Sequence, residues 1–266
     1  MADTDAVAGR VYVWLGGSLW IGRSSGTTTM HVHHAIQITL VLEGSVQLKT
    51  PPDAEWTDYQ AAVIPSHLHH TLRSSRAVSA LIWVEPESPE GHALLDRFGS
   101  DGIQRIPEVL YREAATVMAS AYEDPHNGAG LIAAAQQVVD ILTSGVRRHV
   151  AVDPRILSAI EIIRSRLQGP IVQDEIAEAV FLSPSRFRHL FVEETGMAFR
   201  PYVLWLRLQK ALECISAGES PANAAVAAGF SDTAHMTRTF SRMFGITPGL
   251  LDQKSTRKIS RYVQGE

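Results

Sequence analysis

Two stretches of the sequence share one pattern. Residues 181–196 read FLSPSRFRHLFVEETG, and residues 229–245 read GFSDTAHMTRTFSRMFG. In each stretch a turn is followed by apolar residues at helical spacing, and a glycine then ends the helix. The two closing glycines, Gly196 and Gly245, are 49 residues apart. The repetition predicts two helix-turn-helix units in tandem.

The sequence around the two units is also helical. Residues 202–217 carry an apolar stripe and precede Gly218, which predicts one long helix joining the units. A further helix is expected after Pro154, because proline is favoured at the first helical position. We therefore expect residues 153–266 to form an all-α domain, preceded by a linker over 146–152.

The second helix of each unit has polar residues opposite its apolar stripe. Such a helix fits the DNA major groove, where arginine makes bidentate contacts with guanine. Held by the connecting helix, the two helices could read successive major-groove segments about one turn (~34 Å) apart. A helical bundle with solubilising arginines is the alternative, and two matching copies favour DNA binding over it. The candidate DNA-contacting residues are Ser185, Arg186, Arg188 and His189 in the first unit, and Ala234, His235, Arg238 and Arg242 in the second.

Residues 153–252 resemble the DNA-binding domain of AraC/XylS-type transcription regulators. The matching pieces are Ile176-Ala177, Ser183, Phe191, Glu194-Thr195-Gly196, Tyr202, Arg207-Leu208, Ala211, Gly229-Phe230-Ser231-Asp232, Thr237-Arg238-Thr239-Phe240 and Phe244-Gly245-Ile246-Thr247-Pro248. The resemblance implies seven helices, two of them recognition helices, and double-stranded promoter DNA as the partner. The sequence departs from the family at three points. Phe181 occupies a turn position where the family often has glycine, and Ala224 occupies a position where a larger aliphatic residue is usual. Leu251-Asp252 replaces a Tyr-Arg pair.

The N-terminal half has a different pattern. From Val11 to Val84 the apolar runs are short, rich in β-branched residues and separated by glycine and proline, as in a β-sandwich or barrel. Helical patterns follow over residues 108–121 and 131–144. The fold class is thus α+β with two domains, with a barrel over residues 1–105 and a helical support or dimerisation segment over 106–145. The apolar stripe for a homodimer, which core packing explains equally well, is Val117, Ala121, Leu131, Ala134, Val138, Ile141 and Leu142.

Nine of the eleven histidines precede residue 153. On a strand, His31 and His33 would share one face with Gln37, and imidazoles at i and i+2 can chelate one ion. A third ligand could come from the cluster that follows Pro65. That cluster contains His67, His69 and His70.

The same stretch is similar to the cupin barrel. Gly26, His31-Val32-His33, Gln37 and Gly44 follow the first cupin motif, and residues 65–70 follow the second. The resemblance implies His31, His33 and His70 as metal ligands, with Gln37 in place of the usual glutamate and His67 and His69 as alternates. A three-histidine site would suit one divalent ion among Zn²⁺, Ni²⁺, Fe²⁺ and Co²⁺. Two other roles stay open for these histidines: lining an organic-ligand pocket or the core, and sensing pH or an oxyanion.

Composition excludes several classes of protein. The 266 residues are 45% hydrophobic and 20% charged, with a net charge of −4, as in a globular protein. No apolar run approaches the roughly 18 to 20 residues of a membrane span. The acidic N-terminus does not resemble an export signal, and one cysteine excludes a disulfide framework, so we expect a cytoplasmic protein with no membrane contact.

The patterns together predict an effector-responsive transcription regulator rather than an enzyme. A small molecule or metal in the barrel would control how two DNA-binding domains are presented. One alternative is a cupin oxygenase or isomerase fused to a helical DNA-binding domain, which normally needs the carboxylate that Gln37 replaces. Another is a DNA-binding protein whose barrel serves only for dimerisation.

Overall fold

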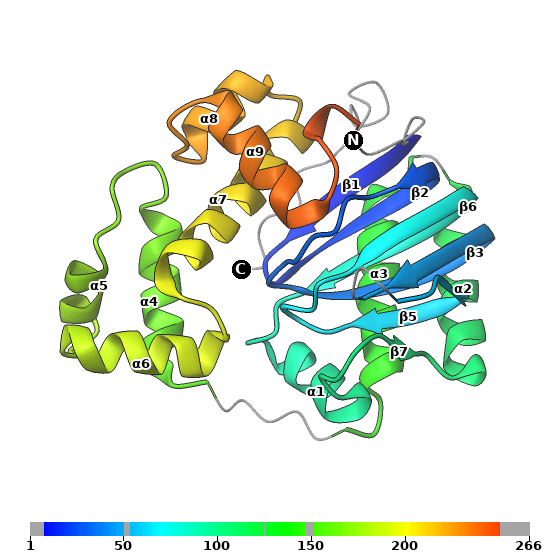
Figure 1. Ribbon diagram of the computed structural model, residues 1–266, viewed down its shortest axis with the longest axis horizontal. Helices are drawn as coiled ribbons and strands as arrows, with labels where there is room; N and C mark the ends of the chain where they lie inside the picture. Colours follow the sequence, from blue (N-terminus) through cyan, green and yellow to red (C-terminus); the bar gives the residue numbers. More distant parts are fainter. Residues whose placement is uncertain (1–7, 51–53, 125, 147–151, 251–266) are drawn as a thin grey trace.

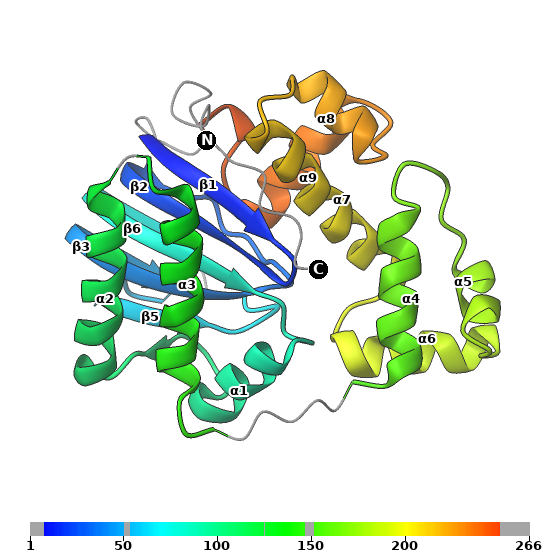
Figure 2. The ribbon, with the colours of Figure 1, turned by 180° about the vertical axis from the view of Figure 1, so that it is seen from behind.

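The computed structural model describes residues 8–50, 54–124, 126–146 and 152–250. An N-terminal antiparallel sheet carries helices on one face, and the C-terminal helices pack against its other side (Figures 1 and 2). The expected α+β arrangement of a sheet followed by a helical part is therefore present. The central residues of the predicted linker, 147–151, and the chain end, 251–266, lie outside the described residues.

Seven strands form one sheet in which every pairing is antiparallel. They are β1 (Ala8–Trp14), β2 (Gly17–Thr27), β3 (Ile36–Lys49), β4 (Thr57–Tyr59), β5 (Ala61–Ile64), β6 (Thr71–Val84) and β7 (Gln104–Arg105). Their order is β1-β2-β6-β3-β5-β7, with β4 paired to β3. Among the described residues no ladder joins β1 to β7, so the sheet is open there rather than closed into the barrel that we expected.

The long strands bend at irregularities in their pairing. The β2–β6 register shifts between Ser24 and Gly26, and the β3–β6 register shifts around Glu43. Gly44 allows the second bend, since its φ is +74° and a Cβ there would lie 2.8 Å from the carbonyl oxygen of Arg76. These bends curve the sheet without a closing strand pair.

Helices α2 (Glu108–Glu123) and α3 (Gly128–Thr143) cover one face of the sheet. Alternate residues of β3, such as Ile36 and Ile38, form one buried cluster with them. A short helix that the sequence did not indicate, α1 (Pro89–Phe98), contacts α3. Most of the apolar stripe proposed for a homodimer, including Leu131 and Val138, is buried in this cluster within one chain. Core packing therefore explains the stripe.

The C-terminal helices lie close to their predicted positions, although α7 begins at Phe199 rather than at Tyr202. They are α4 (Pro154–Ser165), α5 (Gln173–Ala179), α6 (Pro184–Thr195), α7 (Phe199–Ser216), α8 (Pro221–Ala227), α9 (Thr233–Phe244) and the 3-10 helix η1 (Pro248–Leu250). Ser183 caps α6 by accepting the backbone N–H of Arg186, and Gly196 and Gly245 end α6 and α9 in the left-handed conformation. The pairs α5–α6 and α8–α9 are joined by α7. No helix in the described part of the chain is long and apolar enough to cross a membrane.

Phe181, in the turn between α5 and α6, combines a φ of 58° with 95% exposure of its side chain. Left-handed backbone costs a non-glycine residue about 1–2 kcal/mol, and the exposed ring offsets none of it by packing. We expect Phe181→Gly to raise the free energy of unfolding by up to about 1 kcal/mol, after the entropy cost of glycine is subtracted. Denaturant unfolding measures this, with Phe181→Ala as the control that keeps the strain. A gain shared by both variants would contradict backbone strain as the cause.

Candidate effector site and nucleic-acid interface

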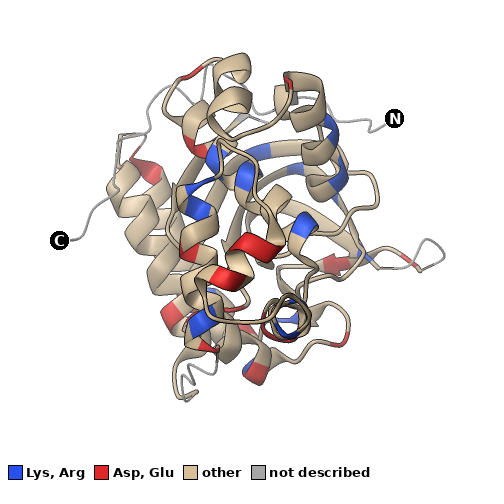
Figure 3. Ribbon diagram, turned by 90° about the vertical axis from the view of Figure 1, so that its left-hand side faces the viewer, with Lys and Arg blue, Asp and Glu red and all other residues tan. Residues whose placement is uncertain are grey.

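The outer face of α6 presents all four candidate DNA-contacting residues of the first unit. Ser185, Arg186, Arg188 and His189 are exposed. Figure 3 shows Lys and Arg positions interspersed with Asp and Glu positions along the ribbon on this side of the molecule. Contacts with DNA would therefore depend on individual side chains more than on a general positive field.

Helix α9 presents its candidates less freely. Ala234, Arg238 and Arg242 are exposed, whereas His235 is half-buried. The His235 Nδ1 atom lies 3.2 Å from the hydroxyl of Ser231, and its ring packs edge-on against Phe230. Local contacts therefore occupy this imidazole.

The two candidate recognition helices are not parallel in this structure (Figures 1 and 2). The last turn of α9 lies against the sheet, where the Thr29 N–H donates to the carbonyl of Gly245 at 2.9 Å. A Cβ at Gly245 would lie 2.6 Å from both the carbonyl oxygen of Thr29, in the segment after β2, and Nδ1 of His31, so the close approach requires glycine. The end of α9 is thus held against the N-terminal half.

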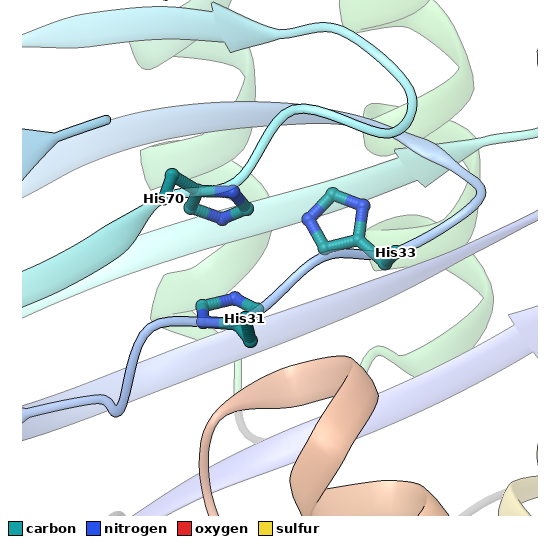
Figure 4. Close-up of side chains that lie close together, drawn as sticks. All are labelled: His31, His33 and His70. Atoms are coloured by element: carbon teal, nitrogen blue, oxygen red, sulfur yellow. The ribbon is translucent and has the colours of Figure 1, made fainter. Parts of the chain in front are cut away.

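His31, His33 and His70 come together at the end of the sheet (Figure 4). They do not lie on one strand as expected, because β3 begins only at Ile36 and the preceding residues bend. Instead, His31 and His70 form an isolated antiparallel bridge with two backbone hydrogen bonds of 3.0 Å. We call these three residues the histidine trio. All three are buried, and their nearest ligand atoms lie within 4.8 Å of one another.

Backbone carbonyls fix the orientation of each imidazole in the trio. The Nδ1 atoms of His31, His33 and His70 lie 2.8, 2.7 and 2.9 Å from the carbonyl oxygens of Thr29, Ala35 and Leu68. A carbonyl oxygen only accepts, so each neutral ring carries its proton on Nδ1 and has a lone pair on Nε2. Among the described residues, the buried Nε2 of His70 has no hydrogen-bond partner. This is the arrangement in which histidines bind metals, with the second nitrogen held by a carbonyl.

Gln37 faces the trio from β3. Its amide donates to the hydroxyl of Thr39 at 3.0 Å, and its Oε1 lies 3.2 Å from Nε2 of His33. With the His33 proton on Nδ1, this contact joins two acceptors and no hydrogen. Two arrangements resolve the conflict: a cation bound by both atoms, or a reversed Gln37 amide that donates to His33 and accepts from the Thr39 hydroxyl.

The trio is neutral near pH 7. Burial lowers the pKa of His31 to about 4 and that of His70 to about 3. Burial, followed by the neighbouring imidazoles, lowers the pKa of His33 well below its ordinary value. Neutral imidazole is the form that binds metals, whereas a pH sensor would titrate closer to neutrality.

The alternate ligands lie outside the trio. His69 is exposed. His67 has a φ of 61° and lies against the end of α6, since a Cβ at Gly196 would be 3.2 Å from its Nε2. Its ring is 5.3 Å from that of His34. Neither residue belongs to the set that the structure brings together.

A pocket adjoins the trio between the sheet and the end of α9. Its polar lining includes His31, His70 and Gln37, together with Arg10, Ser24, Thr28, Ser74 and Ser79. The remaining lining is mainly apolar and includes Trp20, Leu81, Trp83, Phe244 and Ile246. Phe244 ends α9 and Ile246 follows it, and no pattern in the sequence indicated that they would meet Trp20. The C-terminal helices therefore form part of the pocket wall.

Comparisons with known proteins relate this chain to transcriptional regulators. A helix-turn-helix domain family matches residues 176–254. The transcriptional regulator GlxA of Rhizobium meliloti is 27% identical over 168 residues, which are 62% of this chain and 45% of GlxA. The uncharacterised regulator YpdC of Escherichia coli is 32% identical over 88 residues, 33% of this chain and 31% of YpdC. The chain thus spans less than half the length of these curated relatives.

Solved structures share the whole fold. An apo form of ToxT from Vibrio cholerae superposes with a TM-score of 0.61 at 11% identity, covering 91% of this chain and 97% of ToxT. ToxT bound to (E)-4-(8-methylnaphthalen-1-yl)but-3-enoic acid gives a TM-score of 0.55 at 10% identity, covering 95% of this chain and 100% of ToxT. The family match identifies residues 176–254 as a helix-turn-helix domain, the relatives named here are transcriptional regulators, and the likeness to ToxT shows the fold alone.

Proposed function

We propose that this protein is a transcription regulator whose DNA binding responds to an occupant of the pocket beside the histidine trio. The observation that carries the proposal is the shared wall, since Phe244 and Ile246 belong to the AraC-type domain and line the pocket of the sheet. An occupant that contacts these residues changes the free energy of the docked arrangement. DNA binding and effector binding are then coupled through one interface.

On the DNA side, α6 and α9 are the proposed reading helices. Arg188 and Arg238 are exposed and can each make a bidentate contact with guanine. Because the helices are not parallel here, reading two major-groove segments of one duplex requires α9 to leave the sheet. The relatives named as regulators favour this role over catalysis.

Selection of bound sequences from a random duplex pool, followed by footprinting of the full chain, tests the DNA-binding role. We expect a protected site that covers two major-groove segments about one helical turn apart. Protection of one segment only would show that α9 does not read bases. Equal affinity for the selected and the random duplexes would contradict a regulator of specific promoters.

We further propose that the histidine trio holds one divalent transition metal, with Gln37 Oε1 as a fourth ligand. The support is local: a partnerless Nε2 on His70, two facing acceptors at His33 and Gln37, and three Nδ1 protons held by carbonyls. A neutral amide in place of a carboxylate leaves the site with a higher positive charge. Such a site would favour an anionic or lone-pair-bearing effector head in the pocket.

Metal content tests the trio directly. We expect the trio in tag-free protein to hold about one equivalent of Zn²⁺, Ni²⁺, Fe²⁺ or Co²⁺. The His33→Ala/His70→Ala variant should lack this equivalent. Elemental mass spectrometry after exhaustive dialysis measures it. His69→Ala is the matched control, because His69 is exposed in the same segment. Unchanged metal content in the double variant would mean that the trio binds no metal and instead lines an organic-ligand pocket.

A further inference from the structure

A second cluster of titratable residues lies where the sheet meets α7. His34 precedes β3, and Glu85 and Glu87 follow the end of β6. All three side chains are buried, with relative exposures of 0%, 3% and 8%. His34 is the sequence neighbour of His33, yet its ring contacts the rings of Tyr202 and Trp205 on α7 rather than the trio. We call His34, Glu85 and Glu87 the junction cluster.

Helix α7 holds the outer oxygen of each carboxylate. The Tyr202 hydroxyl donates to Oε1 of Glu87. The Trp205 indole N–H donates to Oε1 of Glu85 at 3.2 Å, and the Gln209 amide donates to the same oxygen. The donors from the DNA-binding half thereby leave the second oxygen of each carboxylate directed toward His34.

The three inner atoms converge on one point. Nε2 of His34 lies 2.9 Å from Oε2 of Glu87 and 3.9 Å from Oε2 of Glu85. Among the described residues, Oε2 of Glu85 has no hydrogen-bond partner although the carboxylate is buried. Separations of this size suit ligands of one ion with bonds of roughly 2.0–2.2 Å. All three ligand atoms lie within 4.8 Å of one another.

Charge is compatible with a cation. Two adjacent carboxylates are costly to bury, and a protonated His34, 2.9 Å from Glu87, would compensate only one of them. The other groups that face the pair, Tyr202, Trp205 and Gln209, are neutral donors, and Arg164 acts only at longer range. A divalent ion with two carboxylates and a neutral imidazole has no net charge. The nitrogen and oxygen donors suit Zn²⁺, Mn²⁺ or Fe²⁺.

The second nitrogen of His34 fits the same arrangement. Metal binding at Nε2 places the ring proton on Nδ1, which has no partner among the described residues. The adjacent ring is that of His67, 5.3 Å away between centroids.

We propose that His34, Glu85 and Glu87 bind a second divalent transition cation, separate from the histidine trio. Through the hydrogen bonds of Tyr202, Trp205 and Gln209 this cation fixes α7 against the sheet. Cation occupancy at the junction cluster therefore stabilises the docked arrangement of the two halves. The inference does not depend on what the trio or the pocket binds.

The alternative to a cation is a proton shared by the two carboxylates. Metal stoichiometry distinguishes the cation from the shared proton. Zn²⁺ is titrated calorimetrically into metal-free full-length protein, and the content is checked by elemental analysis. In the His33→Ala/His70→Ala background the trio cannot contribute. We expect this background to bind one equivalent and the same background with Glu85→Gln to bind none. Glu85→Gln keeps the shape of the side chain and an acceptor for Trp205 and Gln209, so the fold should persist.

A spectroscopic and a thermal readout complete the test. Mn²⁺ added to the double-variant background should give the broadened electron paramagnetic resonance signal of a bound ion, which Glu85→Gln abolishes. Zn²⁺ should raise the melting temperature of the background but not of the triple variant. No bound metal in the background, or equal binding after Glu85→Gln, would overturn the cation site and leave the shared proton. A trio that binds no metal would not affect either result.

Discussion

Replacing Phe244 by alanine is expected to lower the free energy of unfolding by about 3–5 kcal/mol, the cost of removing a fully packed aromatic side chain. Phe244 is 4% exposed, and its ring centroid lies 4.8 Å from that of Trp20, 5.2 Å from Trp83 and 4.7 Å from Phe240. Two of these partners belong to the sheet and one to α9. The substitution therefore leaves a cavity at the junction of the two halves.

Denaturant unfolding followed by tryptophan fluorescence measures the loss, because Trp20 and Trp83 report on this junction. Phe181→Ala is a matched control, since it deletes the same side chain where the ring is 95% exposed and should change stability by less than about 0.5 kcal/mol. If Phe244→Ala were as mild as Phe181→Ala, the docked arrangement of α9 on the sheet would not exist in solution. A loss confined to the first part of a biphasic curve would mean undocking before unfolding.

The helical half was predictable because its signals are local. Ser183 caps α6, and Gly196 and Gly245 end their helices in the left-handed conformation, as the repeated pattern indicated. Phe181 occupies left-handed backbone where the resembling family often has glycine, so the departure left a strained residue rather than a different turn. Interactions between residues close in the chain determine these features, so a single sequence is enough to predict them.

The sheet has features that local sequence patterns did not predict. Alternation predicted one strand from His31 onward, but β3 starts at Ile36. His31 and His33 nevertheless meet His70, because a backbone bridge between His31 and His70 and carbonyl contacts replace the strand. Within β3 the alternation holds, since Ile36 and Ile38 both pack against the covering helices.

The junction between the halves could not be predicted from pattern. Glu85 accepts hydrogen bonds from Trp205, 120 residues away, and Phe244 packs on Trp20 across more than two hundred residues. A glutamate is usually exposed, but Glu85 is buried because α7 supplies the hydrogen-bond donors for its carboxylate. Such pairings depend on how two independently patterned domains dock, and no periodicity encodes that choice.

Removing Arg188 from α6 or Arg238 from α9 is expected to weaken specific DNA binding. Arg188→Ala and Arg238→Ala should each cost about 1–3 kcal/mol, or roughly 5–150-fold in affinity for the selected site, because a bidentate contact with guanine is lost. Fluorescence anisotropy at fixed salt measures both variants on the selected and on a random duplex. Arg112→Ala, an exposed arginine on α2 paired with Glu108, is the control.

The comparison between the two variants tests the docked arrangement as well as the contacts. Arg188 lies on α6, whose outer face is already exposed, whereas α9 must leave the sheet before Arg238 can reach a second groove segment. A change that favours undocking, such as Phe244→Ala in protein that remains folded, should therefore increase the cost of Arg238→Ala more than that of Arg188→Ala. Equal losses on selected and random duplexes would instead mean that both arginines contact only phosphates, and base readout by these helices would be wrong.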